Sequence, residues 1–254
     1  MTEDPRSPLA ALVHDIEAHF GRRLVGLYLF GSLAAGDFYP GRSDLDLFAV
    51  LDDEVTDAEI DALREMHERF ETGRTDWRDR IEVLYIGRAV LGTFAVQPRG
   101  RVARISPGEP LHQRDLDGDI GWIMDWHAVL THGEVLAGPP PPTVGPPISQ
   151  AQFLAAVRQQ LEGWRTLVRA GSVAYVPAQQ GYIVATVSRA LYTLARGDQA
   201  SKEKAVAWFA QKHPADSDFV WAAYNAYRAS VREAHDRLIR FVDAAIAEAT
   251  EAPE

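Results

Sequence analysis

A proline-rich segment divides the chain and restricts its folding more than any other feature. Six prolines stand among the ten residues of GPPPPTVGPP, from Gly138 to Pro147. Because proline fixes φ and lacks a backbone N–H, neither a helix nor an inner strand can pass through such a run. The segment is typical of a stiff, extended linker. We therefore predict a domain over residues 1–138, a linker over 139–148 and a second domain over 149–254.

The hydrophobic patterns on the two sides of this segment differ in kind. The first side mixes short apolar or alternating runs, typical of strands, with apolar residues at helical spacing, whereas the second side is almost wholly helical. The predicted strands are 24–30, 44–51 and 80–86. The predicted helices are 9–20, 57–70, 119–130, 149–170, 180–195, 202–212 and 219–249. The fold class is therefore α+β, with a mixed first domain followed by an all-α helical bundle.

The composition disfavours several classes of protein. The 254 residues contain no cysteine, which removes disulfide frameworks, thiolate zinc sites and cysteine nucleophiles. The formal net charge of -10 disfavours a surface that neutralises a nucleic-acid backbone and fits a compact small-molecule substrate better. The N-terminal sequence lacks the basic end and apolar run of a signal peptide, and no stretch approaches the roughly 18 apolar residues of a membrane span. We expect a cytoplasmic protein with neither a nucleic-acid nor a membrane partner, and the sequence leaves its oligomeric state open.

Two aspartates begin the second predicted strand. Side chains two residues apart on a strand point the same way, so Asp44 and Asp46 place two carboxylates on one face. Close carboxylates repel, and they persist in a fold through protonation, a basic partner or a divalent cation. Oxygen-only ligands suit Mg²⁺, which leaves its other positions to water and substrate phosphates. The alternative is that the pair forms a solvated edge of the strand.

A tight turn and a third carboxylate accompany this pair. Gly31 and Ser32 follow immediately on the first predicted strand, where a residue without Cβ lets the backbone approach a phosphate and a hydroxyl can donate to it. Glu82 stands between two apolar residues of the third predicted strand, where burying an ionised group is costly unless a positive group meets it. The combination predicts an anion site beside a metal site. For Glu82 the alternative is the exposed face of an edge strand.

These residues are part of a longer resemblance to a known family. GSLAAGDFYPGRSDLDLF followed by a strand glutamate resembles the signature of the polymerase-beta-type nucleotidyltransferase superfamily. Two later segments resemble one branch of it, the streptomycin/spectinomycin adenylyltransferases that inactivate aminoglycosides. These segments are THGEVLAGP, Thr131 to Pro139, and VSRALYTLARGDQASKEKAVAWFAQKHP, Val187 to Pro214. The resemblance spans most of the chain and implies an N-terminal mixed-sheet nucleotidyltransferase domain followed by an all-α helical-bundle domain.

For the first domain, the resemblance implies a nucleotide and metal site. Gly31 and Ser32 would lie against the nucleotide phosphates, and Ser43 would lie beside them. Asp44 and Asp46 would hold Mg²⁺, with ATP as the co-substrate. These implied roles agree with the anion site and the metal site that the residue types and their spacing predict.

The resemblance also implies roles for residues outside this motif. Glu82 would serve as the general base on the acceptor hydroxyl, and the sequence leaves open whether it is a base, a metal ligand or both. In the second domain, Arg189 and Lys202 match positions that reach across to the triphosphate, and Tyr227 matches a position that lines the nucleotide site. Without the resemblance, Arg189 reads as a surface ion-pair partner and Lys202 as an ordinary first-turn helix lysine.

The sequence departs from this branch mainly where the acceptor should bind. Pro110 stands where streptomycin-modifying members have a tryptophan, and a nucleotide-site aspartate falls on Gly121, two residues after Asp119. The acidic residues expected before the VSRALY helix appear as Gln179, Gln180 and Tyr182. Because the guanidinium cations of streptomycin need aromatic and carboxylate partners, these departures favour spectinomycin as the acceptor.

The sequence therefore predicts an Mg²⁺-dependent enzyme that transfers AMP from ATP to a hydroxyl of a small molecule. The favoured acceptor is an aminoglycoside-type antibiotic, with spectinomycin ahead of streptomycin. Two alternatives stay open, namely a toxin-antitoxin type of nucleotidyltransferase that modifies a protein and a nucleotide-binding module without turnover. The presence of Asp44, Asp46 and Glu82 argues against the second of these.

Overall fold

The computed structural model describes residues 4–38, 40, 43–171, 177–225 and 231–251. The chain forms two compact units, Met1–Ser149 and Gln150–Glu254, and each is described by itself. Within the described ranges, no helix has both the length and the apolar character that crossing a bilayer requires.

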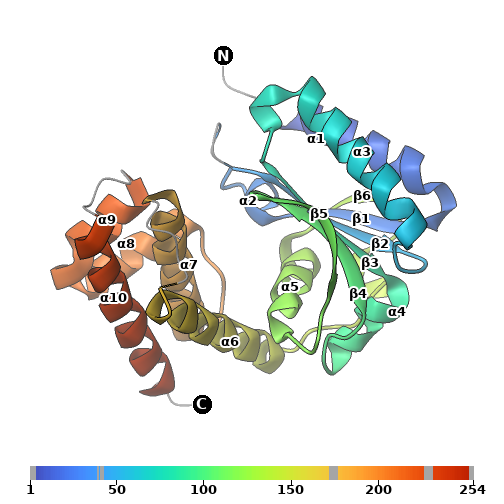
Figure 1. The fold of residues 1–254 in the computed structure, drawn as a ribbon. Helices are drawn as coiled ribbons and strands as arrows, with labels where there is room; N and C mark the ends of the chain where they lie inside the picture. The colour runs from blue at the N-terminus through green and yellow to red at the C-terminus, as the bar shows by residue number, and fades with distance from the viewer. Residues whose placement is uncertain (1–3, 39, 41–42, 172–176, 226–230, 252–254) are drawn as a thin grey trace. The chain divides into compact units, whose positions relative to one another are not determined.

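The first unit contains a mixed sheet whose described strands run in the order β5-β4-β3-β2-β1-β6 (Figure 1). The strands are β1 (Leu24–Phe30), β2 (Leu45–Leu51), β3 (Ile81–Gly87), β4 (Arg101–Ser106), β5 (Glu109–Asp115) and β6 (Glu134–Ala137). β2 and β3 pair in parallel, while the other neighbours in this sheet pair antiparallel. The predicted mixed sheet is confirmed, and the three predicted strands match β1, β2 and β3 to within one residue at each end.

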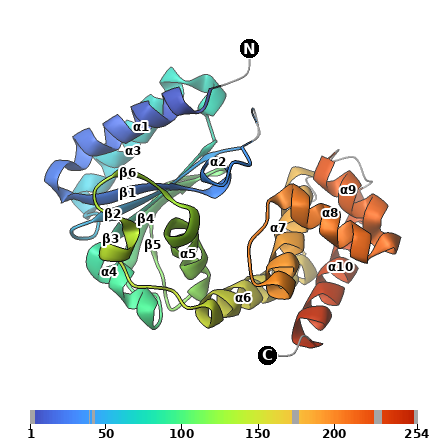
Figure 2. The ribbon, with the colours of Figure 1, turned by 180° about the vertical axis from the view of Figure 1, so that it is seen from behind.

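Helices cover both faces of this sheet. Figures 1 and 2 show α1 (Arg6–Phe20) and α3 (Asp57–Gly73) on one face and α5 (Ile123–His132) on the other. The shorter helices are α2 (Gly31–Ala34), α4 (Arg88–Gly92) and the 3-10 helices η1 (Gly21–Arg23), η2 (Thr75–Trp77), η3 (Thr93–Ala95), η4 (Ile120–Trp122) and η5 (Pro141–Thr143). The helix predicted over 119–130 therefore corresponds to η4 followed by α5.

The central strands bury side chains on both faces, which explains their continuously apolar sequences. Odd-numbered positions of β2, such as Leu47, belong to the core beneath α1 and α3. On the opposite face, Phe48 of β2 and Tyr28 of β1 pack against Trp126 of α5, with ring centroids 5.2 and 6.1 Å apart. Because side chains alternate along a strand, Asp46 lies on the α5 face of the sheet, at the start of β2.

Helix α3 is the crossover that joins the two parallel strands, as parallel pairing requires. Thr56 and Glu59 form a capping box at its start, which satisfies backbone donors that the first turn leaves unpaired. Leu63, Met66 and Phe70 recur at helical spacing and are buried against the sheet. The prediction of a helix from Asp57 is confirmed, and the helix continues three residues beyond its predicted end.

The proline-rich segment, 139–148, falls in the first unit and packs on it. The Tyr28 hydroxyl donates to the carbonyl oxygen of Pro139 at 2.9 Å, and Trp126 Nε1 donates to that of Pro146 at 2.8 Å. The side chains of Pro141 and Val144 are buried. Proline carbonyls keep their acceptor capacity although proline has no N–H, so the segment forms hydrogen bonds while it remains outside the sheet.

The second unit is helical, as predicted. Its described helices are α6 (Gln150–Arg169), α7 (Pro177–Arg196), α8 (Lys202–Lys212), η6 (Pro214–Asp216), α9 (Ser217–Asn225) and α10 (Val231–Glu251). α7 packs against α6, α8, α9 and α10, and is therefore the central helix of the bundle. The single helix predicted over 219–249 corresponds to α9 and α10, with 226–230 outside the described residues.

Candidate functional site

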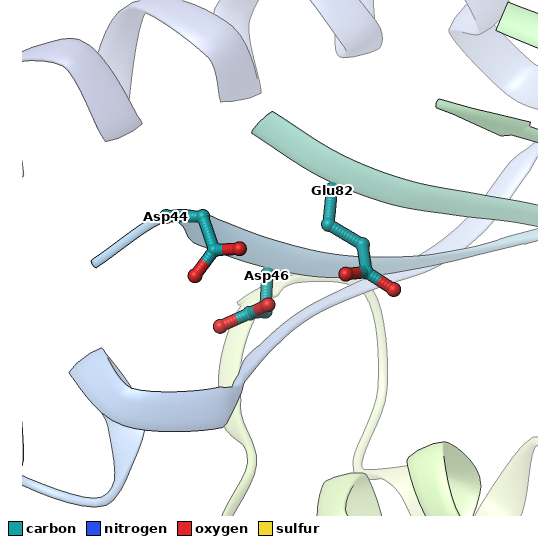
Figure 3. A group of neighbouring side chains, drawn as sticks. All are labelled: Asp44, Asp46 and Glu82. Carbon is teal, nitrogen blue, oxygen red and sulfur yellow. The ribbon is translucent and has the colours of Figure 1, made fainter. Parts of the chain in front are cut away.

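Three carboxylates meet at the start of the two parallel strands (Figure 3). Asp46 of β2 and Glu82 of β3 are register partners in the parallel ladder, and Asp44 comes immediately before β2. One carboxylate oxygen from each residue lies within 4.8 Å of one from each of the others, and all three residues are partly buried. The sheet therefore brings Asp44, Asp46 and Glu82 together, as the residue pattern predicts.

The turn after β1 reaches the same cluster from the neighbouring strand. Phe30, the last residue of β1, pairs with Asp46, so Gly31 comes directly beside the Asp46 side chain. Gly31 has a φ of 68°, and a Cβ on it would lie 1.9 Å from Asp46 Oδ2. Only glycine fits this position without displacing the carboxylate, both because of its φ and because of this close approach.

Ser32 lies in this turn, at the start of the short helix α2. Its Oγ is buried and has no hydrogen-bond partner among the described residues. A buried hydroxyl without a partner costs free energy unless a ligand or water meets it. The turn therefore offers an unused donor close to the carboxylates, which fits the predicted contact of Ser32 with a phosphate.

Arg80, immediately before β3, fixes the backbone that leads into Asp44. Arg80 donates from Nε and Nη2 to the carbonyl oxygen of Ser43, at 3.0 and 2.6 Å, and from Nη1 to that of Asp76 at 2.9 Å. Its guanidinium group stacks on Trp77, 4.3 Å from the ring centroid. Hydrogen bonds from a charged group to a carbonyl are among the stronger ones, so the approach to β2 is held in place.

Arg104 of β4 is a part of the site that the sequence does not predict. Its Nη2 donates to Glu82 Oε1 at 2.9 Å, its Nη1 lies 3.8 Å from Glu109 Oε2, and its guanidinium group lies 5.5 Å from the centroid of the Trp122 ring. Burial lowers the pKa of Arg104, but the carboxylates of Glu82, Asp125 and Glu109 outweigh that effect and raise it above its ordinary value. Its signal in the sequence is a charge between the apolar residues of RVARIS.

The donor set suits a hard divalent cation. Asp44, Asp46 and Glu82 offer only carboxylate oxygens, and no other group of three such ligands occurs in the described part of the chain. Mg²⁺ prefers oxygen ligands and binds through one or two carboxylates together with substrate phosphates. The residues present therefore fit Mg²⁺, with the partnerless hydroxyl of Ser32 available to a phosphate.

The predicted nucleotide residues of the helical domain belong to the second unit. Arg189 lies on α7 and is partly buried. Lys202 is the first residue of α8, and its Nζ lies 4.9 Å from the centroid of the Tyr182 ring. Tyr227 lies outside the described residues. The relation of these residues to the carboxylates stays a prediction.

Four residues stand where aromatic and acidic partners of the acceptor are expected, and they differ in how far they are buried. Pro110 is exposed on β5, whereas Gln180 of α7 is buried, with an exposed fraction of 5% and no partner for Nε2 among the described residues. Tyr182 is half-exposed and contacts Trp164 edge to face. The side chain of Gln179 lies outside the described residues.

Asp119, the residue nearest to the missing nucleotide-site aspartate, has a structural partner. Its Oδ1 accepts a hydrogen bond of 2.8 Å from the backbone N–H of Gly121, and it thereby caps η4. An aspartate that caps a helix in this way stabilises the first turn by satisfying a free donor. The carboxylate of Asp119 is therefore engaged at the start of η4.

Two family models match two separate parts of the chain. Residues 13–86 match the nucleotidyltransferase domain, and residues 143–251 match the aminoglycoside adenylyltransferase C-terminal domain. The first match contains Gly31, Ser32 and all three carboxylates, and the second contains Arg189 and Lys202.

Solved structures add a likeness over the whole chain. The spectinomycin adenyltransferase AAD(9) from Enterococcus faecialis, crystallised with ATP and spectinomycin, superposes with a TM-score of 0.76 at 14% sequence identity. The match covers 98% of this chain and 100% of that one, and at this identity it bears on the fold. A toxin-antitoxin structure with AMP-PNP, also 14% identical, covers 67% of this chain and 100% of that one, but its TM-score of 0.30 is too low to bear on the fold.

Proposed function

Because the chain belongs to the aminoglycoside adenylyltransferase family of nucleotidyltransferases, we propose that it transfers AMP from ATP to a hydroxyl of a small molecule. The proposed acceptor is an aminoglycoside-type antibiotic, with spectinomycin favoured over streptomycin. The observation that supports the proposal most directly is the in-register pairing of Asp46 with Glu82, whose neighbouring carboxylates would bind the metal and accept the proton.

Asp44 and Asp46 would hold Mg²⁺, which when bound neutralises charge on the triphosphate and on the departing pyrophosphate. Ser32 would donate its buried Oγ–H to a phosphate oxygen, which satisfies the group that has no protein partner among the described residues. The Gly31 backbone can approach that phosphate closely because no Cβ intervenes. These residues bind and orient the donor nucleotide.

Glu82 would accept the proton of the acceptor hydroxyl. As the hydroxyl oxygen forms its bond to the α-phosphorus of ATP, the bond from that phosphorus to the bridging oxygen breaks and pyrophosphate leaves. The products are an adenylyl ester of the acceptor and pyrophosphate, with one proton on Glu82 that passes to water. General-base catalysis of this kind needs the base within hydrogen-bond reach of the hydroxyl, which a carboxylate on the α5 face of β3 can provide.

The acceptor class is supported by the family of the helical domain and by the relative crystallised with ATP and spectinomycin. A pyrophosphate-release assay with ATP, Mg²⁺ and a panel of aminoglycosides tests it. We expect release that depends on the acceptor and is strongest with spectinomycin. Absence of release with every member of the panel would contradict the proposed acceptor class.

Glu82→Gln separates binding from chemistry. The amide cannot take a proton, so we expect turnover to fall by about 100-fold or more while binding of ATP with Mg²⁺, measured by calorimetry, stays within about twofold of wild type. Loss of nucleotide binding together with turnover would instead make Glu82 a ligand of the metal.

A further inference from the structure

Arg104 forms a hydrogen bond with Glu82, the residue that accepts the proton of the acceptor hydroxyl in the proposed function. Its Nη2 donates to Glu82 Oε1 at 2.9 Å, and both side chains are largely buried, with exposed fractions of 23% and 22%. A glutamate carboxylate has three rotatable side-chain bonds and stands here among two other carboxylates that repel it. Without a partner, its position toward the acceptor would be poorly defined.

Arg104 is itself held from other directions. Its guanidinium group lies over the ring of Trp122, and Nη1 faces Glu109 Oε2, which in turn accepts a hydrogen bond of 3.2 Å from Ser106 Oγ. A planar guanidinium group fixed by a ring and a second carboxylate is a rigid donor. Contacts with Trp122 and Glu109 thus hold the guanidinium group that donates to the Glu82 carboxylate on β3.

We propose that Arg104 is a positioning residue for Glu82, occupying Oε1 so that Oε2 is the oxygen that accepts the proton of the acceptor hydroxyl. The inference rests on the proposed role of Glu82 as the base. A reacting group that is already held in a defined orientation loses less entropy on reaching the transition state, so the reaction is faster. Arg104 therefore acts on kcat through Glu82, and the binding of ATP does not require it.

The chain offers a matched control in Arg114 of β5. Its guanidinium group lies over the same Trp122 ring, 5.6 Å from the centroid, and it makes no ion pair with Glu82 among the described residues. Arg114→Met and Arg104→Met remove the same charged group from the same ring. Only the second removes a hydrogen bond to the base.

The experiment compares steady-state kinetics of the full chain with ATP, Mg²⁺ and spectinomycin. For Arg104→Met we expect kcat to fall by about tenfold or more with the KM for ATP within about twofold, and for Arg114→Met we expect both within about twofold. Arg104→Lys keeps the charge but loses the planar fork, and we expect an intermediate kcat. If Arg104→Met does not fold, as judged by circular dichroism, Arg104→Lys carries the test, and an unchanged kcat for it overturns the proposal.

A double variant distinguishes positioning from a general effect on the fold. If Arg104 acts through Glu82, adding Arg104→Met to Glu82→Gln changes the residual turnover by less than about twofold, because the base is already absent. Multiplicative losses would overturn the proposal while leaving the role of Glu82 intact. A wild-type protein without turnover toward any acceptor would overturn the proposed function and this inference together.

Discussion

Asp46 is the residue on which the geometry of the site depends most closely. It pairs with Phe30 on one side and Glu82 on the other, and its carboxylate occupies the space that a side chain at position 31 would need. Three strands and one glycine therefore converge on a single carboxylate. A change at this residue alters the charge of the cluster without altering the backbone that builds it.

We expect Asp46→Asn to reduce turnover by about 100-fold or more, because an amide is a poor substitute for a charged ligand of Mg²⁺. The ligand-free variant should unfold at the same temperature as wild type or higher, since one charge leaves a group of three close carboxylates. Pyrophosphate release and thermal unfolding in the presence of a chelator measure the two effects. Substantial turnover in the purified variant would show that Asp46 does not hold the metal.

Glu82 could be identified from the sequence because it interrupts an otherwise apolar strand, where an unpaired charge is costly, and Asp44 and Asp46 because their two-residue spacing places both on one face. Arg104 interrupts RVARIS in the same way, but that stretch also reads as an exposed, charged edge. Its contact with Glu82 depends on the pairing of β4 with β3, in which Leu84 faces Arg104. Nothing local in the sequence specifies that pairing.

At the scale of elements, prediction succeeded for strands whose burial on both faces produces a continuous apolar run and failed for β4, β5 and β6, whose sequences form no such run. β1, β2 and β3 are buried on both faces and were predicted almost to the residue. β5 buries only Leu111 fully and β6 is four residues long, so neither produces an apolar pattern. Such strands form because a neighbouring strand offers unpaired N–H and C=O groups, and this pairing depends on the tertiary structure and not on the local sequence.

A buried polar contact joins α3 to β3 and is the basis for an expected sensitivity of the first unit to acid. His67 Nε2 and the Tyr85 hydroxyl are 2.8 Å apart, both residues are buried, and His67 Nδ1 has no partner among the described residues. Burial, together with the nearby charge of His19, lowers the pKa of His67 to about 3. The fold therefore accommodates His67 in its neutral form.

The unfolded chain binds a proton at His67 below about pH 6.5, whereas the folded protein does so only near pH 3. Stability from this residue is thus present above pH 6.5 and is lost as the pH falls toward 3. We expect the free energy of unfolding of wild type to decrease across this window by up to about 1.4 kcal/mol per pH unit more steeply than that of His67→Gln. Denaturant unfolding at several pH values measures the slopes.

His14→Gln is the matched control for this measurement, because His14 is an exposed histidine on α1. Its slope should equal that of wild type. If His67→Gln retained the full acid sensitivity, the titration responsible would belong to other groups, and the buried contact with Tyr85 would have no role in it.

At the scale of the whole molecule, the family resemblance predicts that Lys202 of the second unit contributes to nucleotide binding. We expect Lys202→Met to raise the KM for ATP by about tenfold or more, because a charged contact with the triphosphate would be lost. Lys204→Met supplies the comparison, since Lys204 lies in the same helix with its Nζ 5.5 Å from the centroid of the Tyr192 ring. Equal KM values for both variants and wild type would assign nucleotide binding to the first unit alone.

The choice of acceptor is the second property of the whole molecule. We expect this protein to confer little or no streptomycin resistance on a susceptible bacterium, because Pro110 and the buried Gln180 offer no aromatic or carboxylate partner to a guanidinium cation. Spectinomycin depends less on such contacts and should be modified. Strong streptomycin resistance that disappears with Asp46→Asn would show that other residues recognise the drug.

The parallel ladder of β2 and β3 also determines which changes of length the protein can tolerate. Because Asp46 and Glu82 face each other through backbone register, a single-residue insertion or deletion near the start of either strand would turn one carboxylate to the opposite face of the sheet. The connection before α3 carries no such register constraint, whereas the connection after it contains Trp77 and Arg80, which hold the backbone at Ser43. In a library of insertions and deletions, active members should therefore vary in the length of the connection before α3 while the two strand starts keep their spacing to the carboxylates.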